Sequence, residues 1–273
     1  MKIALFTGHH PRHRYLMNIL KTNNLLDFLV IENRESHKPE FPVKSNKKYV
    51  KLFNKHFQNR EDVEHIVFGN NDIKFHNKLF VDSNKINDKK NIDKFKNNNI
   101  DLIITTGIGV LSSETIKSLG CPIWNIHGGL SPQFKGAITH FWPSYLLKPQ
   151  YTGCTIHFIE PKIDAGEIIH QTPAVLERGD GLHMLASKSL KKGYDSIITL
   201  IEYFKKNNQI QSFPQKQTGK LWLKKDWKPY HLEVIYNTYS DKIVDKFLDG
   251  DFDSFYPKIF NNRAFNKNNN QIL

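Results

Sequence analysis

The chain has 273 residues, of which 39% are hydrophobic and 24% are charged, a composition typical of a globular protein. This length is enough for one large domain, or for a domain with a smaller appendage. No apolar run approaches the roughly 20 residues that cross a bilayer, so no membrane span is expected. The net charge of +12 favours anionic partners, but the lysines are mixed with asparagines and form no arginine-rich stripe. Nucleic acid is therefore not the expected ligand.

The N-terminus and the cysteines indicate a reducing compartment. The first apolar stretch stops at Gly8, which is too short for the core of a signal peptide and is typical of a buried strand. The two cysteines, Cys121 and Cys154, each lie in an apolar segment, and we expect both to be buried free thiols. These features predict a cytoplasmic protein.

Short apolar runs and amphipathic stretches alternate over the first half of the chain. Leu16, Ile19 and Leu20, for example, have helical spacing after a first apolar strand. The predicted strands are 2–8, 27–33, 101–107 and 121–127, and the predicted helices are 12–24, 47–68, 88–99 and 112–119. Strands that alternate with helices are typically parallel and joined by crossovers. The fold class expected is α/β, with an open, mostly parallel, Rossmann-like sheet.

The second half continues with a loop after residue 127 and an aromatic-rich helix over 137–147. Alternating strands are predicted at 152–160 and 167–176, where they can pair, and the longest amphipathic helix at 181–206. The remainder contains one possible strand at 220–225, helices within 231–248 and an Asn-rich end that we expect to be frayed. We therefore divide the chain into an α/β domain, 1–206, and a small mixed C-terminal appendage, 207–273.

Three polar side chains lie where a site is expected. Asn125 and His127 are at the carboxyl end of a strand, about 6.6 Å apart on one face, which is where open α/β sheets place their sites. A carboxamide and an imidazole there can stabilise an oxyanion, as acyl transfer to an amine requires. Asp164, in a loop between two apolar strands, would orient His127 and raise the pKa of its imidazole. Taken alone, however, such a pair is more often a hydrogen-bonded strand end, and a loop aspartate is usually a turn residue.

The residues around these three side chains decide between the alternatives. The sequence resembles the signature of the folate-dependent formyltransferases, the superfamily of methionyl-tRNA formyltransferase and glycinamide ribonucleotide formyltransferase, over about residues 1–206. The first block of the signature is matched by Asn125, His127, Leu130, Pro132, Phe134, Lys135 and Gly136, and the second by Gly153, Thr155, His157, Asp164, Gly166, Ile168, Ile169 and Gln171. Gly128, Gly129 and Ser131 depart from the commoner residues, which indicates a divergent branch.

The resemblance implies a folate-dependent N-formyltransferase with 10-formyltetrahydrofolate as its co-substrate and no metal. It implies that Asn125 and His127 bind the developing oxyanion, and that Asp164 manages protons through His127 or a water. It also implies a folate pocket between the Asp164 loop and the loop after the predicted strand 101–107, made by Gly107, Ile108, Gly109, Val110 and Leu111.

The branch of the family sets the expected acceptor. The loop after the first strand, GHHPRHRYL, lacks the glycines with which backbone amides cradle the phosphate of glycinamide ribonucleotide. The residues after 206 are few for the tRNA-binding barrel of the methionyl-tRNA enzymes. The sequence is most similar to the sugar N-formyltransferases, which implies a nucleotide-linked amino sugar as acceptor, a role in lipopolysaccharide O-antigen synthesis, and a homodimer. The alternatives are formylation of methionyl-tRNA and a non-catalytic RNA-binding protein with the same fold.

Candidate substrate contacts follow the first strand and the first signature block. Arg12, His13 and Arg14 are placed to meet a substrate phosphate, although a solvated helix start explains them equally well. Phe134, Lys135 and Trp142 are the other candidates, and for Trp142 core packing is the more usual role. His9 and His13 have the spacing of two metal ligands on a helix, but no third ligand follows them, so we expect no metal site.

Overall fold

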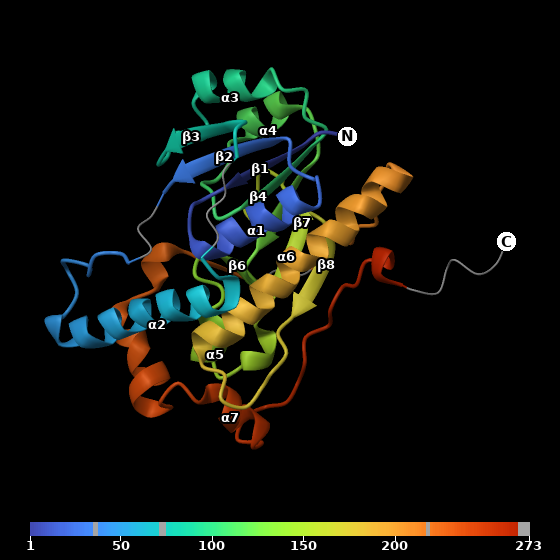
Figure 1. The fold of residues 1–273 in the computed structure, drawn as a ribbon. Helices are drawn as coiled ribbons and strands as arrows, with labels where there is room; N and C mark the ends of the chain where they lie inside the picture. The colour runs from blue at the N-terminus through green and yellow to red at the C-terminus, as the bar shows by residue number, and fades with distance from the viewer. Residues whose placement is uncertain (35–37, 71–74, 217–218, 267–273) are drawn as a thin grey trace.

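The computed structural model describes residues 1–34, 38–70, 75–216 and 219–266 (Figure 1). The predicted frayed end at 267–273 lies outside the described residues. A seven-stranded sheet with the order β3-β2-β1-β4-β5-β7-β8 forms the centre. Its strands are β1 (Ile3–Thr7), β2 (Phe28–Asn33), β3 (Lys78–Asp82), β4 (Leu102–Thr106), β5 (Ile123–His127), β7 (Gly153–Phe158) and β8 (Ile168–Pro173). The first five are parallel, and β7 runs antiparallel to both of its neighbours, β5 and β8, which confirms the predicted, mostly parallel fold class.

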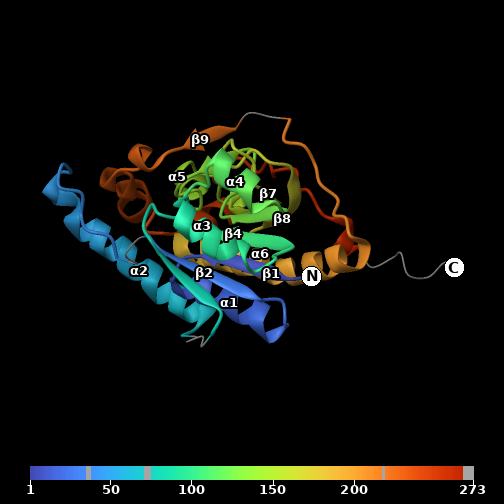
Figure 2. The ribbon, with the colours of Figure 1, turned by 90° about the horizontal axis from the view of Figure 1, so that it is seen from above.

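Helices cover both faces of this sheet. They are α1 (Pro11–Thr22), α2 (Val50–Phe68), α3 (Lys89–Lys96), α4 (Ser113–Leu119), α5 (Trp142–Tyr145), α6 (Leu182–Asn207) and α7 (Ile243–Leu248). Seen from above, α1, α2 and α6 lie on one side of the sheet and α3 and α4 on the other (Figure 2). Single helical turns occur at Lys47–Tyr49, Pro149–Tyr151, Lys224–Asp226, Pro229–His231, Val234–Thr238 and Arg263–Phe265.

The alternation of apolar side chains along β1 builds the two halves of the core. Ile3 and Leu5 pack with α1 and α6, whereas Ala4 and Phe6 pack with α3 and α4. All four side chains are at most 1% exposed. A strand buried on both faces is an almost continuous apolar run, which is the pattern by which β1 was predicted.

Three short elements differ from the sequence analysis. Neither β3 nor β6 (Phe134–Gly136) was predicted, because β3 lies at the sheet edge with Val81 as its one buried residue and β6 is only three residues long. The helix predicted over 137–147 is limited to α5, since Ile138 has a positive φ of 58° that a helix does not accept. Tertiary packing of the loop outweighs the helical spacing of its aromatic residues.

The chain after α6 returns to the sheet domain and packs along it. Its strand β9 (Lys220–Trp222) pairs in parallel with β6, and Phe213 forms a β-bridge with Ile168. Farther on, the Asn262 amide donates to the carbonyls of Ile169 and Gln211. The division at residue 206 stays a proposal, but the segment that follows it contributes to the surroundings of the site described below.

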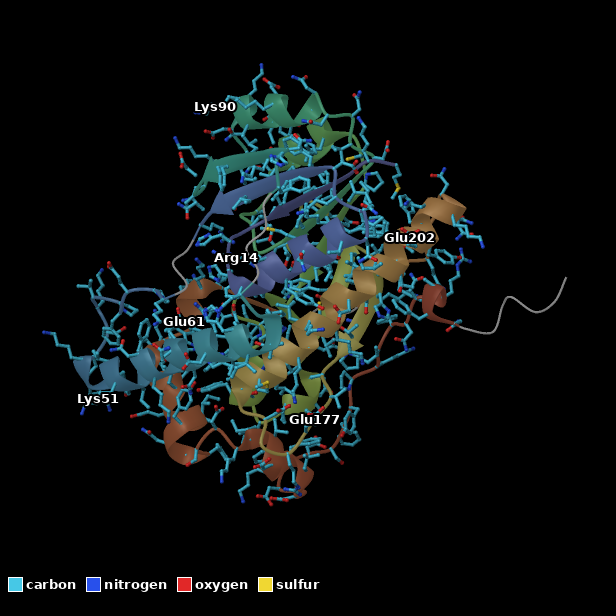
Figure 3. The ribbon with its side chains drawn as sticks, in the orientation of Figure 1. Arg14, Lys51, Glu61, Lys90, Glu177 and Glu202 are labelled. Carbon is cyan, nitrogen blue, oxygen red and sulfur yellow. The ribbon has the colours of Figure 1, made fainter. Side chains whose placement is uncertain are left out.

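Charged side chains are distributed over the outside of the molecule. Lys51, Lys90, Glu177 and Glu202 are all exposed and lie at its periphery (Figure 3). Among the residues that the structure describes, no helix has both the length and the apolar character to cross a membrane.

Candidate active site

Adjacent strands bring two of the polar side chains together. Asn125 of β5 lies directly opposite His157 of β7 in the antiparallel register, and opposite Thr105 of β4 on its other side. The Asn125 amide Nδ2 is 3.1 Å from His157 Nε2, and its Oδ1 accepts a hydrogen bond of 2.9 Å from the Thr105 hydroxyl. The amide of Asn125 is therefore held from both neighbouring strands.

The Asp164 carboxylate lies between two imidazoles. One oxygen is 3.4 Å from His127 Nδ1, and the other is 3.4 Å from His157 Nε2. The Gly136 amide donates to Oδ2 at 2.7 Å. The side chain of Asp164 is 11% exposed, and those of His127 and His157 are 7% and 2% exposed. The structure thus brings Asn125, His127 and Asp164, the predicted catalytic residues, into one buried cluster.

The electrostatics of this cluster keep Asp164 ionised. Burial alone raises the pKa of the carboxyl, but the neighbouring His127 and His157 and the hydrogen bond from Gly136 outweigh it. The net result is a pKa well below the usual range of an aspartic acid. The cluster therefore contains a carboxylate throughout the neutral range, ready to accept proton density from an imidazole.

The hydrogen bonds of His127 define what its ring can do. Nε2 is 2.8 Å from the carbonyl oxygen of Phe134, and because a carbonyl only accepts, Nε2 carries a hydrogen. The 3.4 Å separation between Nδ1 and Asp164 is longer than a good hydrogen bond, so this contact can yield to a ligand atom. Catalytic hydrogen bonds are often long until the substrate is bound.

Two further signature residues hold the loop after β5. The Thr155 hydroxyl donates to the Gly129 carbonyl at 2.7 Å and accepts from the Ser131 amide at 3.0 Å. The Gln171 amide donates to the Ser131 carbonyl at 2.6 Å. Both side chains are buried, at 0% and 2% exposure, so their part in the signature is to fix this loop beside His127.

The cluster opens into a cavity of about 740 Å³. Asn125, His127, His157 and Asp164 all line it. Gly107, Ile108, Gly109, Val110 and Leu111, the predicted folate loop, line it as well. On another side, its wall is formed by one face of α2, together with residues of α1, α6 and the segment that follows β9. The volume of the cavity is in the range of small-molecule binding sites, and Asn125 lies in its wall.

Arg12 and Arg14, two of the predicted substrate contacts, differ in their position relative to the cavity. Arg12 lines the cavity, but its guanidinium is paired with the buried Glu64 of α2. Arg14, which is labelled in Figure 3, does not line the cavity. Its side chain donates to the His9 carbonyl at 3.1 Å. A phosphate-binding pair of Arg12 and Arg14 is therefore not what this geometry favours.

His13 is wedged between the ends of β1 and β4. A Cβ added at Gly8 would lie 2.7 Å from His13 Nδ1, and one added at Gly107 would lie 2.5 Å from Nε2, so only glycine fits at either position. Burial, followed by the charge of Arg12, lowers the pKa of His13 well below its usual value. Its Nδ1 is buried without a hydrogen-bond partner, at the cavity wall. His13 is thus a neutral, buried ring in the cavity wall.

The remaining candidates lie behind the cavity wall. Phe134, Lys135 and Trp142 are 6%, 8% and 2% exposed and are not among the residues that line the cavity. The Trp142 indole stacks on Trp222 at 4.0 Å, and its Nε1 donates to the Ala137 carbonyl at 3.2 Å. In this structure Trp142 packs in the core, which is the role that the sequence analysis favoured over substrate contact.

Sequence reasoning missed several residues of the cavity wall. His56, Arg60 and Glu64 of α2 recur every four residues, which places them on one helix face. That spacing of polar residues was the available signal, but the helix was predicted from its apolar residues alone. Gln215 was missed because its partners are far away in the sequence: its amide donates to the carbonyls of Asp164 and Gly166 and anchors the Asp164 loop.

Ile138, at the cavity wall, has a strained backbone. Its φ of 58° is in the left-handed region, which costs a β-branched residue about 1–2 kcal/mol, and its side chain is 40% exposed. Asparagine tolerates this conformation, so Ile138→Asn is expected to raise the free energy of unfolding by about 1 kcal/mol. Thermal denaturation should then show a midpoint about 2–4 °C higher. An unchanged or lower midpoint would mean that apolar contacts of Ile138 outweigh the backbone strain.

Within residues 1–34, 38–70, 75–216 and 219–266, no group of three or more histidine, cysteine, aspartate or glutamate side chains is arranged to hold a metal ion. The carboxylate and imidazoles of the cluster contact one another, the Asn125 amide and backbone groups instead.

One family of known sequences matches most of this chain. The sequence profile described as formyl transferase matches residues 1–201. Over 92 residues, the chain is 36% identical to the trifunctional purine biosynthetic protein adenosine-3 of Gallus gallus, an overlap of 33% of this chain and 9% of that protein. Over 147 residues, it is 31% identical to the methionyl-tRNA formyltransferase of Blochmanniella floridana, covering 50% of this chain and 41% of that one. The chain therefore spans less than half the length of these two relatives.

Solved structures share the fold. A sugar N-formyltransferase from Shewanella sp. superposes with a TM-score of 0.55 at 16% identity, covering 83% of this chain and 78% of that one. The formyltransferase PseJ from Anoxybacillus kamchatkensis, solved in complex with UDP-4,6-dideoxy-4-formamido-L-AltNAc and tetrahydrofolate, superposes with a TM-score of 0.51 at 18% identity. That match covers 88% of this chain and 95% of the other. At such identities, the likeness establishes the fold.

Proposed function

Because the chain belongs to the formyl transferase family, we propose that it transfers the formyl group of 10-formyltetrahydrofolate to the amine of a nucleotide-linked amino sugar. The observation that carries this proposal is the buried cluster in which Asp164 lies between His127 and His157, with the Asn125 amide beside them. An ionised carboxylate, two imidazoles and a carboxamide at the carboxyl ends of the strands meet the needs of acyl transfer to an amine.

In the proposed reaction, the acceptor amine attacks the formyl carbon and a C–N bond forms. The Asn125 amide donates a hydrogen bond to the oxygen that becomes negative, and His127 donates a second one once its Nδ1 has taken up a proton. The attacking nitrogen releases a proton, which His127 and Asp164 accept directly or through a water. The bond between the formyl carbon and the folate nitrogen then breaks, and that nitrogen takes up a proton as it leaves. The products are a formamide and tetrahydrofolate, so no oxidant or reductant is required.

We place the folate between residues 107–111 and the Asp164 loop. Side chains from both loops line the cavity, including Val110 and Ile163, which are 60% and 37% exposed. Exposed apolar groups beside backbone amides and carbonyls suit a flat heterocycle, which needs apolar contact on its faces and hydrogen bonds at its edge. This placement supports the formyl donor that the resemblance implied.

We place the acceptor on the α2 side of the same cavity. Phe53, Phe57 and Trp227 line it there, and the Arg60 guanidinium lies 4.7 Å over the Phe57 ring. Lys224 lines the cavity near them. Aromatic faces with basic side chains beside them suit a base or sugar linked to a diphosphate. The complex of the PseJ structure contains such a compound, and we propose the same acceptor class for this chain.

Arg60 provides a test of this placement. Arg60→Met keeps much of the side-chain volume but removes the charge, and we expect it to raise the acceptor KM about tenfold or more, the effect of losing one charge-assisted hydrogen bond. The KM for 10-formyltetrahydrofolate should change less than twofold, as should kcat. Steady-state kinetics with each substrate varied in turn will measure both constants. A rise in the folate KM alone would place the two substrates the other way round.

Acceptor-dependent turnover tests the proposed function itself. The purified protein is mixed with 10-formyltetrahydrofolate and a panel of UDP-, dTDP- and GDP-linked amino sugars, and release of tetrahydrofolate is recorded. We expect release with at least one amino sugar and none when its amine is already acetylated. Release with methionyl-tRNA alone would assign the alternative acceptor. No release with any amine, together with tight RNA binding, would favour a non-catalytic protein.

The proposal extends to the cellular compartment, the oligomeric state and the product of the enzyme. We propose that it acts in the cytoplasm as a homodimer, and that its product is a precursor of a surface polysaccharide such as the O-antigen. Residues 1–206 would carry out the chemistry, whereas residues 207–273 would complete the acceptor side of the cavity, to which Trp227 belongs.

A further inference from the structure

Glu32 is a buried carboxylate at the end of β2, and the reaction outlined above does not use it. Its side chain is 0% exposed, yet it belongs to the wall of the cavity. Oε2 accepts a hydrogen bond of 2.6 Å from the Gly109 amide, and Oε1 accepts one of 3.2 Å from the Asn84 amide. A carboxylate away from water must be compensated by hydrogen bonds, and these two come from two different loops.

The loop over residues 107–111 is held by neighbouring side chains as well. Arg34, also at the end of β2, donates to the Ile108 carbonyl at 2.6 Å. Asn87 donates to the Val110 carbonyl at 2.9 Å and accepts from the Ser112 amide at 2.8 Å. Three consecutive residues, 108–110, thus each have a backbone group bound to a side chain from outside the loop. Such a loop is fixed before a ligand arrives.

We propose that Glu32 is a positioning residue for the folate site: it holds the Gly109 amide and thereby sets the shape of the loop that receives the pterin. The proposal rests on the folate placement given above. Gly109 itself supports it, because a Cβ at this position would lie 3.2 Å from Glu32 Oε1. Any larger residue would therefore meet the carboxylate in a tight contact, so the close approach of the loop favours glycine. Binding to a fixed loop avoids the entropic cost of ordering it, so the tie to Glu32 favours folate binding.

The test is the dissociation constant of tetrahydrofolate, measured by calorimetry, since it requires no knowledge of the acceptor. Glu32→Gln keeps the shape of the side chain but turns an NH₂ group toward one of the two backbone amides. We expect this variant to bind tetrahydrofolate about tenfold more weakly than the parent. Arg34→Ala, which frees the Ile108 carbonyl, should weaken binding about threefold and provides a second variant if the first does not fold.

Asp82→Asn is the matched control, because Asp82 is an exposed carboxylate at the end of the neighbouring β3. It should bind tetrahydrofolate like the parent. If Glu32 only stabilised the fold, Glu32→Gln would have a lower thermal midpoint but the folded variant would bind tetrahydrofolate with the parental affinity. That result would overturn the proposal. So would parental affinity in Arg34→Ala if Glu32→Gln failed to fold. A parent protein that binds no tetrahydrofolate would refute the proposed function itself, which is a separate outcome.

Discussion

Replacing Asp164 with asparagine is expected to lower kcat by ~10²–10³ while the fold is kept. The substitution removes the negative charge between His127 and His157 and leaves an amide oxygen that can still accept from the Gly136 amide. Without that charge, nothing compensates the positive charge that forms on the imidazole as it accepts the proton that the acceptor amine releases. Because this effect arises in the transition state, both KM values should change little.

The control for this variant is Asp93→Asn, an exposed carboxylate on α3. It should retain the parental kcat. Circular dichroism and thermal denaturation of Asp164→Asn establish whether the protein is folded. Activity within a factor of three of the parent would show that Asp164 does not manage protons in the reaction.

Asn125→Ala is expected to have a similarly large effect for a different reason. The alanine removes the amide that we assign to the developing oxyanion, and loss of one such donor typically lowers kcat by ~10²–10³. The His127–Asp164 contact should survive, because it does not involve Asn125. Pre-steady-state kinetics should show that the chemical step is slowed, while substrate binding is nearly unchanged.

Thr105→Val tests whether catalysis depends on the orientation of the Asn125 amide as well as on its presence. The Thr105 hydroxyl donates to Asn125 Oδ1 at 2.9 Å, so its loss leaves the donor in place but less firmly held. We expect a decrease in kcat of about five- to tenfold, the scale of one neutral hydrogen bond. If Asn125→Ala were no slower than Thr105→Val, the amide would not act as an oxyanion donor.

Part of the candidate catalytic cluster could be predicted from strand periodicity and strand ends, which are local properties, and the signature blocks supplied the rest. The apolar run that ends at His127 indicated a buried strand, and its alternation placed Asn125 and His127 on one face. The register in which β5 and β7 pair could not be inferred from the sequence. His157 therefore received no catalytic assignment, although the antiparallel pairing of β5 with β7 places it directly opposite Asn125.

The cavity walls could not be predicted, because they depend on tertiary packing. The pairing of Arg12 with Glu64 joins α1 to α2, and no local pattern in either helix indicates the other. Likewise, β6 is only three residues long and was not predicted; it pairs with the distant β9, which lies within the strand predicted at 220–225. Trp227 reaches the cavity through that packing. Short elements with weak local preferences are those that tertiary context decides.

The fate of a labelled formyl group tests the central claim most directly. The protein is incubated with 10-formyltetrahydrofolate labelled with ¹³C in its formyl carbon and with the amino-sugar nucleotide that supports turnover, and the products are analysed by mass spectrometry and NMR. We predict that the label appears as a formamide on the sugar amine, in equal amount to the tetrahydrofolate released, and that Asp164→Asn forms it at least a hundredfold more slowly. Label found only as free formate, or transfer that is equally fast in Asp164→Asn, would contradict the account.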